Sequence, residues 1–290
     1  MKKINPLELF LWTFRRKEKD IINLYDALSD LMRLATEGDM LNFGYWDEKT
    51  TTPLEAQKKM CTLFGKKSLL ESNQRIVDVG SGIGSPAIQW YLEYSPVKLS
   101  CININFKQLL SSINNVNKII PAYGTQNFNF INATATTLPF ENDSIDRVIS
   151  LEAAQHFKPL KNFISESFRI LKKNGKLALA IPVMSNNNSR SIMKLGTLSF
   201  TWSSEHYSME FVETILKHEG FSNIDLQKIG SNVYSPLANY YIENRNIIRN
   251  KILQSYPQYV ERILFKSLNK MKLVSEKNII DYILISCSKK

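Results

Sequence analysis

The chain has 290 residues, of which 43% are hydrophobic and 22% charged, so a sizeable core can form and a disordered or fibrous protein is excluded. Three scattered cysteines without a C-x-x-C pair, and only three histidines, argue against a disulfide framework and a metal site. The net charge of +10 is compatible with nucleic acid, anionic lipid or an acidic substrate.

The positive charge is concentrated near the C-terminus, where residues 241–290 hold ten Lys or Arg against four Asp or Glu. We interpret this excess as a solvated helical face, although the same charges could meet a phosphate or a lipid surface. No apolar run approaches the roughly 18 residues of a membrane span, and no convincing signal peptide is present. The unpaired cysteines favour a reduced compartment, so we expect a cytoplasmic protein.

The N-terminal part reads as helix over residues 5–36, with an apolar stripe at Leu7, Phe10, Leu11 and Phe14. This stripe could lie on a membrane, pack on the core or close over a substrate, and core or lid packing is favoured. An aromatic turn at 42–46 and a second amphipathic helix at 54–71 follow. We therefore predict a helical segment or lid over residues 1–72.

From residue 75 onward, short apolar strands alternate with helices. The pattern predicts a parallel sheet with right-handed crossovers. Lys173-Asn174-Gly175 is expected to end the helix over 159–172. The predicted strands are 75–79, 97–103, 127–132, 145–151 and 176–182, and the helices run from Pro86 to about Tyr94, over 106–119 and over 159–172.

The C-terminal third predicts a helix at 208–218, stopped by Gly220, a strand at 221–228 and a last strand at 279–287. The stretch between these strands is far longer than a hairpin loop of about 2–5 residues, so it must be an inserted, largely helical cap. The predicted α/β core thus covers 73–229 and 276–290, and the cap covers 230–275.

Three glycines follow the first strand of the core, at Gly80, Gly82 and Gly84. Glycine tolerates positive φ and lets a ligand approach the backbone, and ligands of such sheets bind at the carboxyl ends of the strands. The turn therefore marks a ligand site, and the alternative is a tight strand–helix turn without a ligand.

The spacing of this turn discriminates between ligands. A nicotinamide-binding turn has the pattern G-x-G-x-x-G, whereas position 85 here is serine. Asp78 lies two residues before the first glycine, and its carboxylate would repel a pyrophosphate. A ligand with a cationic amino group, such as S-adenosylmethionine, fits this arrangement better.

With the turn read in this way, the sequence resembles the class I methyltransferases, and within them the group that modifies polyketides, macrolide sugars, sterols and prenylated phenols. Five motifs match in order over residues 40–230. They are Asn42-Phe43-Gly44-Tyr45-Trp46, the glycine turn Val77–Gly84, Leu138-Pro139-Phe140 with Ser144-Ile145-Asp146, Glu152–Phe157, and Glu166 with Arg169–Gly175.

The resemblance implies a Rossmann-like seven-stranded sheet, six strands parallel and one antiparallel, that binds S-adenosylmethionine. The family's acid after the second strand is replaced by Asn103, and its acid near the adenine by Thr134; both can hydrogen-bond without the strength of a charge. The expected cofactor residues are Asp78, Gly80, Ser81, Gly82, Gly84, Asn103, Ile104, Thr134, Ala135 and Leu151.

In the motif that ends the fourth strand, His156 is the best candidate for a general base, because an unperturbed imidazole titrates near neutrality. Glu152 is the second catalytic candidate. The alternatives are a structural histidine and a polar strand end. Weaker candidates for contact with the acceptor are Tyr45, Trp46, Gln155 and His206.

The acceptor is expected to be a small molecule or a lipid or quinone-like compound, methylated on O, N or C. A nucleic-acid methyltransferase is the main alternative, but no D-P-P-Y or N-P-P-Y run is present, so no nucleic acid is expected. A nicotinamide oxidoreductase is disfavoured by Ser85 and Asp78. A binding module without activity stays open because of Asn103 and Thr134.

Overall fold

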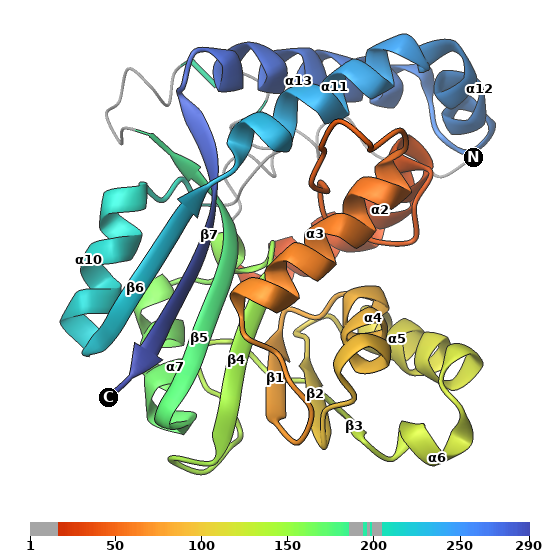
Figure 1. Cartoon of the computed structure of the whole chain (residues 1–290). Helices are drawn as coiled ribbons and strands as arrows, with labels where there is room; N and C mark the ends of the chain where they lie inside the picture. Colours follow the sequence, from red (N-terminus) through yellow and green to blue (C-terminus); the bar gives the residue numbers. More distant parts are fainter. Residues whose placement is uncertain (1–16, 186–193, 196–197, 199–204) are drawn as a thin grey trace. The chain divides into compact units, whose positions relative to one another are not determined.

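The computed structural model describes residues 17–185, 194, 195, 198 and 205–290 (Figure 1). The predicted stripe from Leu7 to Phe14 lies outside the described residues, and the helix that begins there in the prediction is described as α2 (Glu18–Thr36). The chain divides into two compact units. Unit 1 comprises residues 1–59, 184–206 and 229–281, and unit 2 comprises 60–183, 207–228 and 282–290.

A seven-stranded sheet in the order β3-β2-β1-β4-β5-β7-β6 confirms the predicted Rossmann-like fold. The ladders between β3, β2, β1, β4 and β5 are parallel, and β6 pairs with β7 in antiparallel fashion. The strands are β1 (Arg75–Val79), β2 (Lys98–Ile102), β3 (Phe128–Ile131), β4 (Ile145–Leu151), β5 (Leu171–Met184), β6 (Phe221–Lys228) and β7 (Ile280–Lys289).

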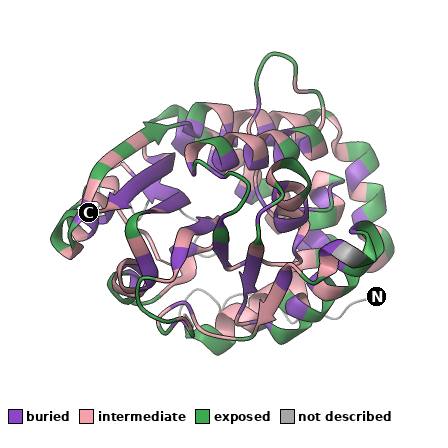
Figure 2. Ribbon diagram, turned by 60° about the horizontal axis from the view of Figure 1, so that its bottom comes forward, coloured by how far each residue is buried: buried purple, intermediate pink, exposed green. Residues whose placement is uncertain are grey.

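Strands β1 and β2 are buried along nearly their whole length and β4 is buried or half-buried throughout, as expected of a parallel sheet covered on both faces (Figure 2). One core cluster joins strand residues such as Val77, Val148 and Leu177 to Phe163 and Val212 on two covering helices. The helices of this part are α3 (Pro53–Lys67), α4 (Ser85–Tyr94), α5 (Phe106–Ile119), the short α6 (Ala122–Thr125), the 3-10 turn η1 (Ala154–His156), α7 (Leu160–Ile170) and α10 (Met209–Glu219).

The predicted end of the helix over 159–172 is wrong. Helix α7 ends at Ile170, and Leu171 already has extended backbone with ψ 136°. Leu171 is fully buried and pairs with Ile145 of β4, so a ladder partner and burial favour the strand over another helical turn. Lys173-Asn174-Gly175 therefore lie inside β5, where the register to β4 shifts and Asn174 has φ 64°.

Unit 1 is mainly helical, and α11 runs along α13 (Figure 1). Its core joins Leu31 and Ala35 of α2 to Tyr241, Ile248 and Tyr256. No helix among the described residues is long and apolar enough to cross a bilayer. Residues 230–275 form η2 (Gly230–Asn232), α11 (Tyr234–Glu243), α12 (Arg245–Ser255) and nearly all of α13 (Gln258–Glu276).

Candidate functional site

The glycine turn joins β1 to α4, and its backbone takes positive φ at three alternate positions. Gly80, Gly82 and Gly84 have φ of 82°, 56° and 82°. The amides of Gly80 and Ser81 both donate to the carbonyl of Ile102 at the end of β2, at 2.8 and 3.1 Å. The turn is thus anchored to the neighbouring strand, and the positive φ at its three glycines disfavours a side chain at those positions.

Close packing adds a second reason for glycine at two of these positions. A Cβ atom on Gly80 would lie 2.2 Å from the Cβ of Ala153, just after β4. A Cβ atom on Gly84 would lie 2.0 Å from the hydroxyl of Ser112 on α5. The turn is therefore wedged between the end of β4 and α5, which fixes its backbone for a ligand.

Asp78 supplies the charge of this site. Its side chain is 2% exposed, and its Oδ2 atom has no hydrogen-bond partner among the described residues. Burial raises the pKa of this carboxyl to about 7. A buried carboxylate with one unpartnered oxygen beside the turn fits a ligand that brings a cationic group, so the residues present suit the ammonium of S-adenosylmethionine.

Asn103 lies directly after β2 and ties the turn to α5. Its Nδ2 donates to the carbonyl of Gly82 (3.1 Å) and to Oε1 of Gln108 (3.0 Å), while its Oδ1 accepts from the amide of Asn105 (2.9 Å). The side chain of Asn105 in turn accepts from the amide of Gln108 and so caps the N-terminus of α5. An aspartate at position 103 could not donate to Gly82, so the amide has a structural use here.

The remaining predicted cofactor residues lie after β3 and in β4. The Nδ2 of Asn132 donates to the carbonyls of Asn103 and Ile104, at 2.7 and 3.0 Å. The hydroxyl of Thr134 lies 3.1 Å from that of Thr136. Ala135 is buried in the unit 2 core, and Leu151 ends β4.

Glu152 has a strained backbone, with φ 53°, directly after β4. Its buried side chain accepts a hydrogen bond at Oε1 from the hydroxyl of Tyr282, at 2.9 Å. The carbonyl of Glu152 accepts from Nε2 of Gln155 at 2.7 Å, and Gln155 Oε1 is buried with no hydrogen-bond partner among the described residues. The segment after β4 therefore offers an acceptor atom to a ligand.

His156 ends η1, where its amide donates to the carbonyl of Ala153. The side chain is partly exposed, and burial of its ring lowers the pKa of the imidazole to about 4. The ring is accordingly neutral near pH 7 and able to accept a proton. Tyr207 lies close by in the same unit, since its hydroxyl donates to the carbonyl of Phe157.

The other predicted acceptor residues, Tyr45, Trp46 and His206, belong to unit 1. The amide of Trp46 donates to the carbonyl of Asn232 (2.7 Å), and Asn232 Nδ2 donates back to the carbonyl of Trp46 (2.8 Å). The Trp46 ring lies 5.8 Å from that of Tyr240. Contact of these three residues with an acceptor stays a prediction.

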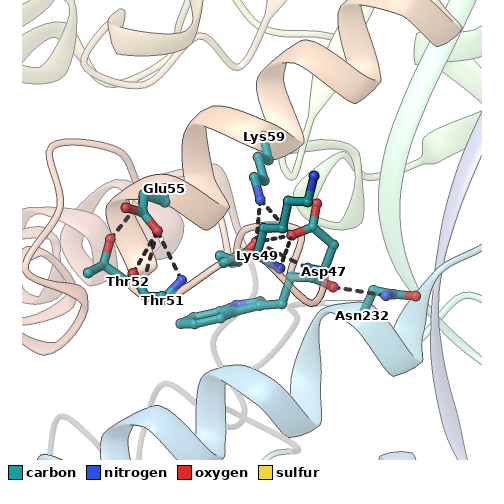
Figure 3. A network of polar contacts seen from close by, with 9 residues as sticks. Asp47, Lys49, Thr51, Thr52, Glu55, Lys59 and Asn232 are labelled. Atoms are coloured by element: carbon teal, nitrogen blue, oxygen red, sulfur yellow. Dashed lines mark hydrogen bonds and ion pairs between the residues drawn. The ribbon is translucent and has the colours of Figure 1, made fainter.

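A polar network fixes the loop that follows Trp46 (Figure 3). Asp47 Oδ1 accepts from Nζ of Lys59 at 2.5 Å and from the amide of Lys49, while Glu55 accepts from the amides of Thr51 and Thr52. The Lys59 ammonium holds the pKa of Asp47 down at about 2. The charged groups of Asp47, Glu55 and Lys59 are therefore engaged in stabilising this loop.

Several residues of the site were not predicted from the sequence. Ala153 and Ser112 are small residues that a search for chemistry passes over, and Tyr282 is far along the chain from Glu152. Gln108 and Asn105 could have been found, because asparagine is a frequent first residue of a helix. Among the described residues, no group of three His, Cys, Asp or Glu side chains is arranged to hold a metal ion.

Comparison with known proteins agrees with this geometry. Residues 77–179 match the family model of the methyltransferase domain. Erythromycin 3''-O-methyltransferase of Saccharopolyspora erythraea is 25% identical over 96% of this chain and 93% of its own length. The 27-O-demethylrifamycin SV methyltransferase of Amycolatopsis mediterranei is 31% identical over 53% of this chain and 55% of its own.

The fold has close counterparts among solved structures. Mycolic acid cyclopropane synthase CmaA1, complexed with SAH and CTAB, superposes with a TM-score of 0.80 at 17% identity, covering 95% of this chain and all of that one. The glycine turn, the unpaired Asp78, the strand order and the matched domain agree on one family. Residues 77–179 form a methyltransferase domain, and the chain is a methyltransferase that uses S-adenosylmethionine as its cofactor.

Proposed function

We propose that this enzyme transfers a methyl group to a hydroxyl oxygen of a bulky small molecule. The observation that carries the proposal is the alignment with the erythromycin 3''-O-methyltransferase, which runs through both units and nearly the full length of each chain. The rifamycin enzyme, matched over 53% of this chain, is named for an oxygen as well. Oxygen is thus favoured over nitrogen or carbon.

When bound, the cofactor supplies an activated methyl group on its sulfonium. In the proposed mode of binding, Asp78 faces the ammonium group, and the backbone at Gly80, Gly82 and Gly84 provides close contact that no Cβ atom obstructs. Asn103 keeps one acceptor lone pair on Oδ1 for a ribose hydroxyl, because its amide hydrogens already hold the turn. Thr134 is the proposed polar contact for the adenine.

His156 is the proposed proton acceptor. A hydroxyl becomes strongly acidic only while it gains the methyl group, so a base of low pKa suffices if proton transfer accompanies methyl transfer. The depressed pKa of the His156 imidazole keeps the ring neutral, and hence ready to accept, at every pH above about 5. The proton passes from the acceptor oxygen to an imidazole nitrogen.

Glu152 is proposed to position the reacting groups through its neighbours. Its carboxylate is engaged by the Tyr282 hydroxyl and its carbonyl by Gln155, so it stiffens the segment that carries His156. Gln155 Oε1 is the atom we assign to a donor on the ligand. Tyr282→Phe should then raise KM or lower kcat without affecting the fold of β7.

The proposal is tested by the identity of the product. The enzyme is incubated with S-adenosylmethionine carrying a ¹³C-labelled methyl group and with extracts or a panel of macrolide and polyketide alcohols. Mass spectrometry finds the labelled product, and the carbon chemical shift of the new methyl separates O-methyl from N- and C-methyl. A labelled methoxy group is expected, whereas a methylated nitrogen or carbon contradicts the proposal.

The role of His156 is tested on the same reaction. His156→Ala should lower turnover at least tenfold with little change in cofactor affinity. His218→Ala, an exposed histidine at the end of α10, is the matched control and should leave turnover unchanged. Full turnover of the His156→Ala variant would rule out the proton-acceptor role.

A further inference from the structure

One face of α13 carries a row of cations that is interrupted by a single leucine. Arg262, Lys266 and Lys270 follow at intervals of four residues, Leu273 continues the row, and Lys277 extends it just beyond the last helical residue, Glu276. At about 100° per residue these five side chains fall within an arc of roughly 80°. We call them the basic stripe.

The cations of the basic stripe are available to a partner. Arg262, Lys266 and Lys277 are exposed and Lys270 is partly exposed. No carboxylate among the described residues forms an ion pair with any of these four. Their charge is therefore not neutralised within the part of the chain that the structure describes.

The acidic residues of α13 do not cancel the stripe, because both are engaged elsewhere. Glu261 is fully buried, and its two oxygens accept from Arg245 at 2.8 and 3.1 Å. Glu276 lies 4.0 Å from Lys272, off the arc of the stripe. The opposite face of the helix carries buried residues such as Val260 and Met271, so the stripe is the outer face.

An apolar side chain accompanies these cations at the surface. Leu273 lies within the stripe between Lys270 and Lys277 and is 50% exposed. A phosphate backbone gains little from a leucine, whereas a lipid surface accepts both the cations at its headgroups and the leucine at the acyl boundary. The mixture therefore favours a lipid partner over a nucleic acid.

We propose that the basic stripe of α13 docks this enzyme on the surface of a bilayer that contains anionic phospholipids. The docking is peripheral, with the helix axis along the membrane plane and Leu273 at the level of the acyl boundary. Each cation near an anionic surface contributes about a fivefold gain in partition, so four contribute several hundredfold. The basic stripe belongs to unit 1 and the glycine turn to unit 2, and the proposal does not depend on which acceptor is methylated.

The test is cosedimentation of the full chain with vesicles of phosphatidylcholine, with and without an equal share of phosphatidylglycerol. Wild-type protein should bind only the anionic vesicles and be released by high salt. Arg262→Gln/Lys266→Gln/Lys270→Gln should weaken this binding about a hundredfold. Leu273→Asn should weaken it about tenfold, through the apolar contact alone.

A matched variant removes the same charge from unit 2. Lys118→Gln/Lys161→Gln/Lys173→Gln replaces three exposed lysines and should bind anionic vesicles nearly as wild type does. Calorimetry with S-adenosylhomocysteine shows whether each variant is still folded, because a folded variant keeps its cofactor site. Release of wild type by salt shows that the binding to vesicles is electrostatic. The expected result is a defect confined to the α13 variants.

Three results would overturn the proposal. One is absence of wild-type binding to anionic vesicles at low salt. Another is equal loss in both triple variants, which would mean that only net charge matters. The third is binding to a polyuridylate RNA that the α13 triple variant loses and Leu273→Asn does not, because such a surface would recognise nucleic acid.

Discussion

Asp78 gives the sharpest test of how the cofactor is held. Its carboxyl is buried without a hydrogen-bond partner for Oδ2, and burial raises its pKa to about 7 in the ligand-free protein. A bound ammonium group stabilises the ionised form, so binding below pH 7 must first expel a proton. Affinity for S-adenosylhomocysteine should therefore increase as pH rises through 7.

The magnitude follows from the fraction of Asp78 that is ionised. With a pKa of about 7, this fraction is about 9% at pH 6 and about 91% at pH 8, so affinity should rise about tenfold between these values. Asp78→Asn removes the charge and should weaken binding at pH 8 by about 2–4 kcal/mol, the range expected for one partner of a buried pair. Its affinity should also become independent of pH.

The assay is calorimetry at pH 6, 7 and 8 with wild type and Asp78→Asn. Methylthioadenosine, which lacks the amino-acid part, is the control ligand and should bind both proteins equally at every pH. The same slope in wild type and Asp78→Asn, or no slope in wild type, would refute the pairing of Asp78 with the ammonium group.

The ligand-free protein offers an independent check on the same residue. The pKa of Asp78 is raised by folding from 3.8 to about 7, so ionisation in the folded state costs stability that grows between pH 4 and 7. Asp78→Asn should therefore be more stable than wild type at pH 8, by up to about 4 kcal/mol, and equal to it near pH 4. Urea denaturation measures this difference.

Three further predictions follow from packing and charge. Gly80→Ala should destabilise unit 2 by about 2–4 kcal/mol in thermal or urea unfolding, because its Cβ meets Ala153 at 2.2 Å and its φ is 82°; adding Ala153→Gly should restore the part due to the clash. Glu261→Gln should cost about 2–4 kcal/mol by leaving arginine charge without its buried partner, whereas Glu276→Gln at the surface should stay within about 0.5 kcal/mol. Protonation of His156 should not change turnover between pH 6 and 8, and should lower turnover only as the pH approaches the pKa of about 4. An inflection of the pH profile near 6.5 that His156→Ala removes would contradict this.

Local sequence signals predicted the sheet well because its strands are short, apolar and bounded by turn residues. The limits of β1, β4 and β6 agree with those read from the sequence, and the glycine turn lies where its spacing indicates. The end of α7 was predicted wrongly because residues 173–175 are typical of a helix end, and the pairing of Leu171 with Ile145 of β4 is not visible in the sequence. Pairing across the sheet decided that boundary, and a single sequence does not display it.

The site shows the same division between local and distant information. Asp78, the glycines and Asn103 were found because they follow strands at recognisable spacings. The depressed pKa of His156 was not foreseen, since burial of its ring depends on segments brought together by folding. Nor did spacing reveal that the amide of Asn103 holds Gly82, which gives a physical reason for the absence of an acid at that position.

Calorimetric titration of the enzyme with S-adenosylhomocysteine, with NAD as the parallel ligand, tests the central claim most directly. We predict one-to-one binding of S-adenosylhomocysteine and no binding of NAD. In Gly80→Ala/Ala153→Gly, binding of S-adenosylhomocysteine should weaken only as far as the turn is distorted. No detectable binding of S-adenosylhomocysteine at millimolar concentration, or saturable binding of NAD instead, would contradict the assignment of this site.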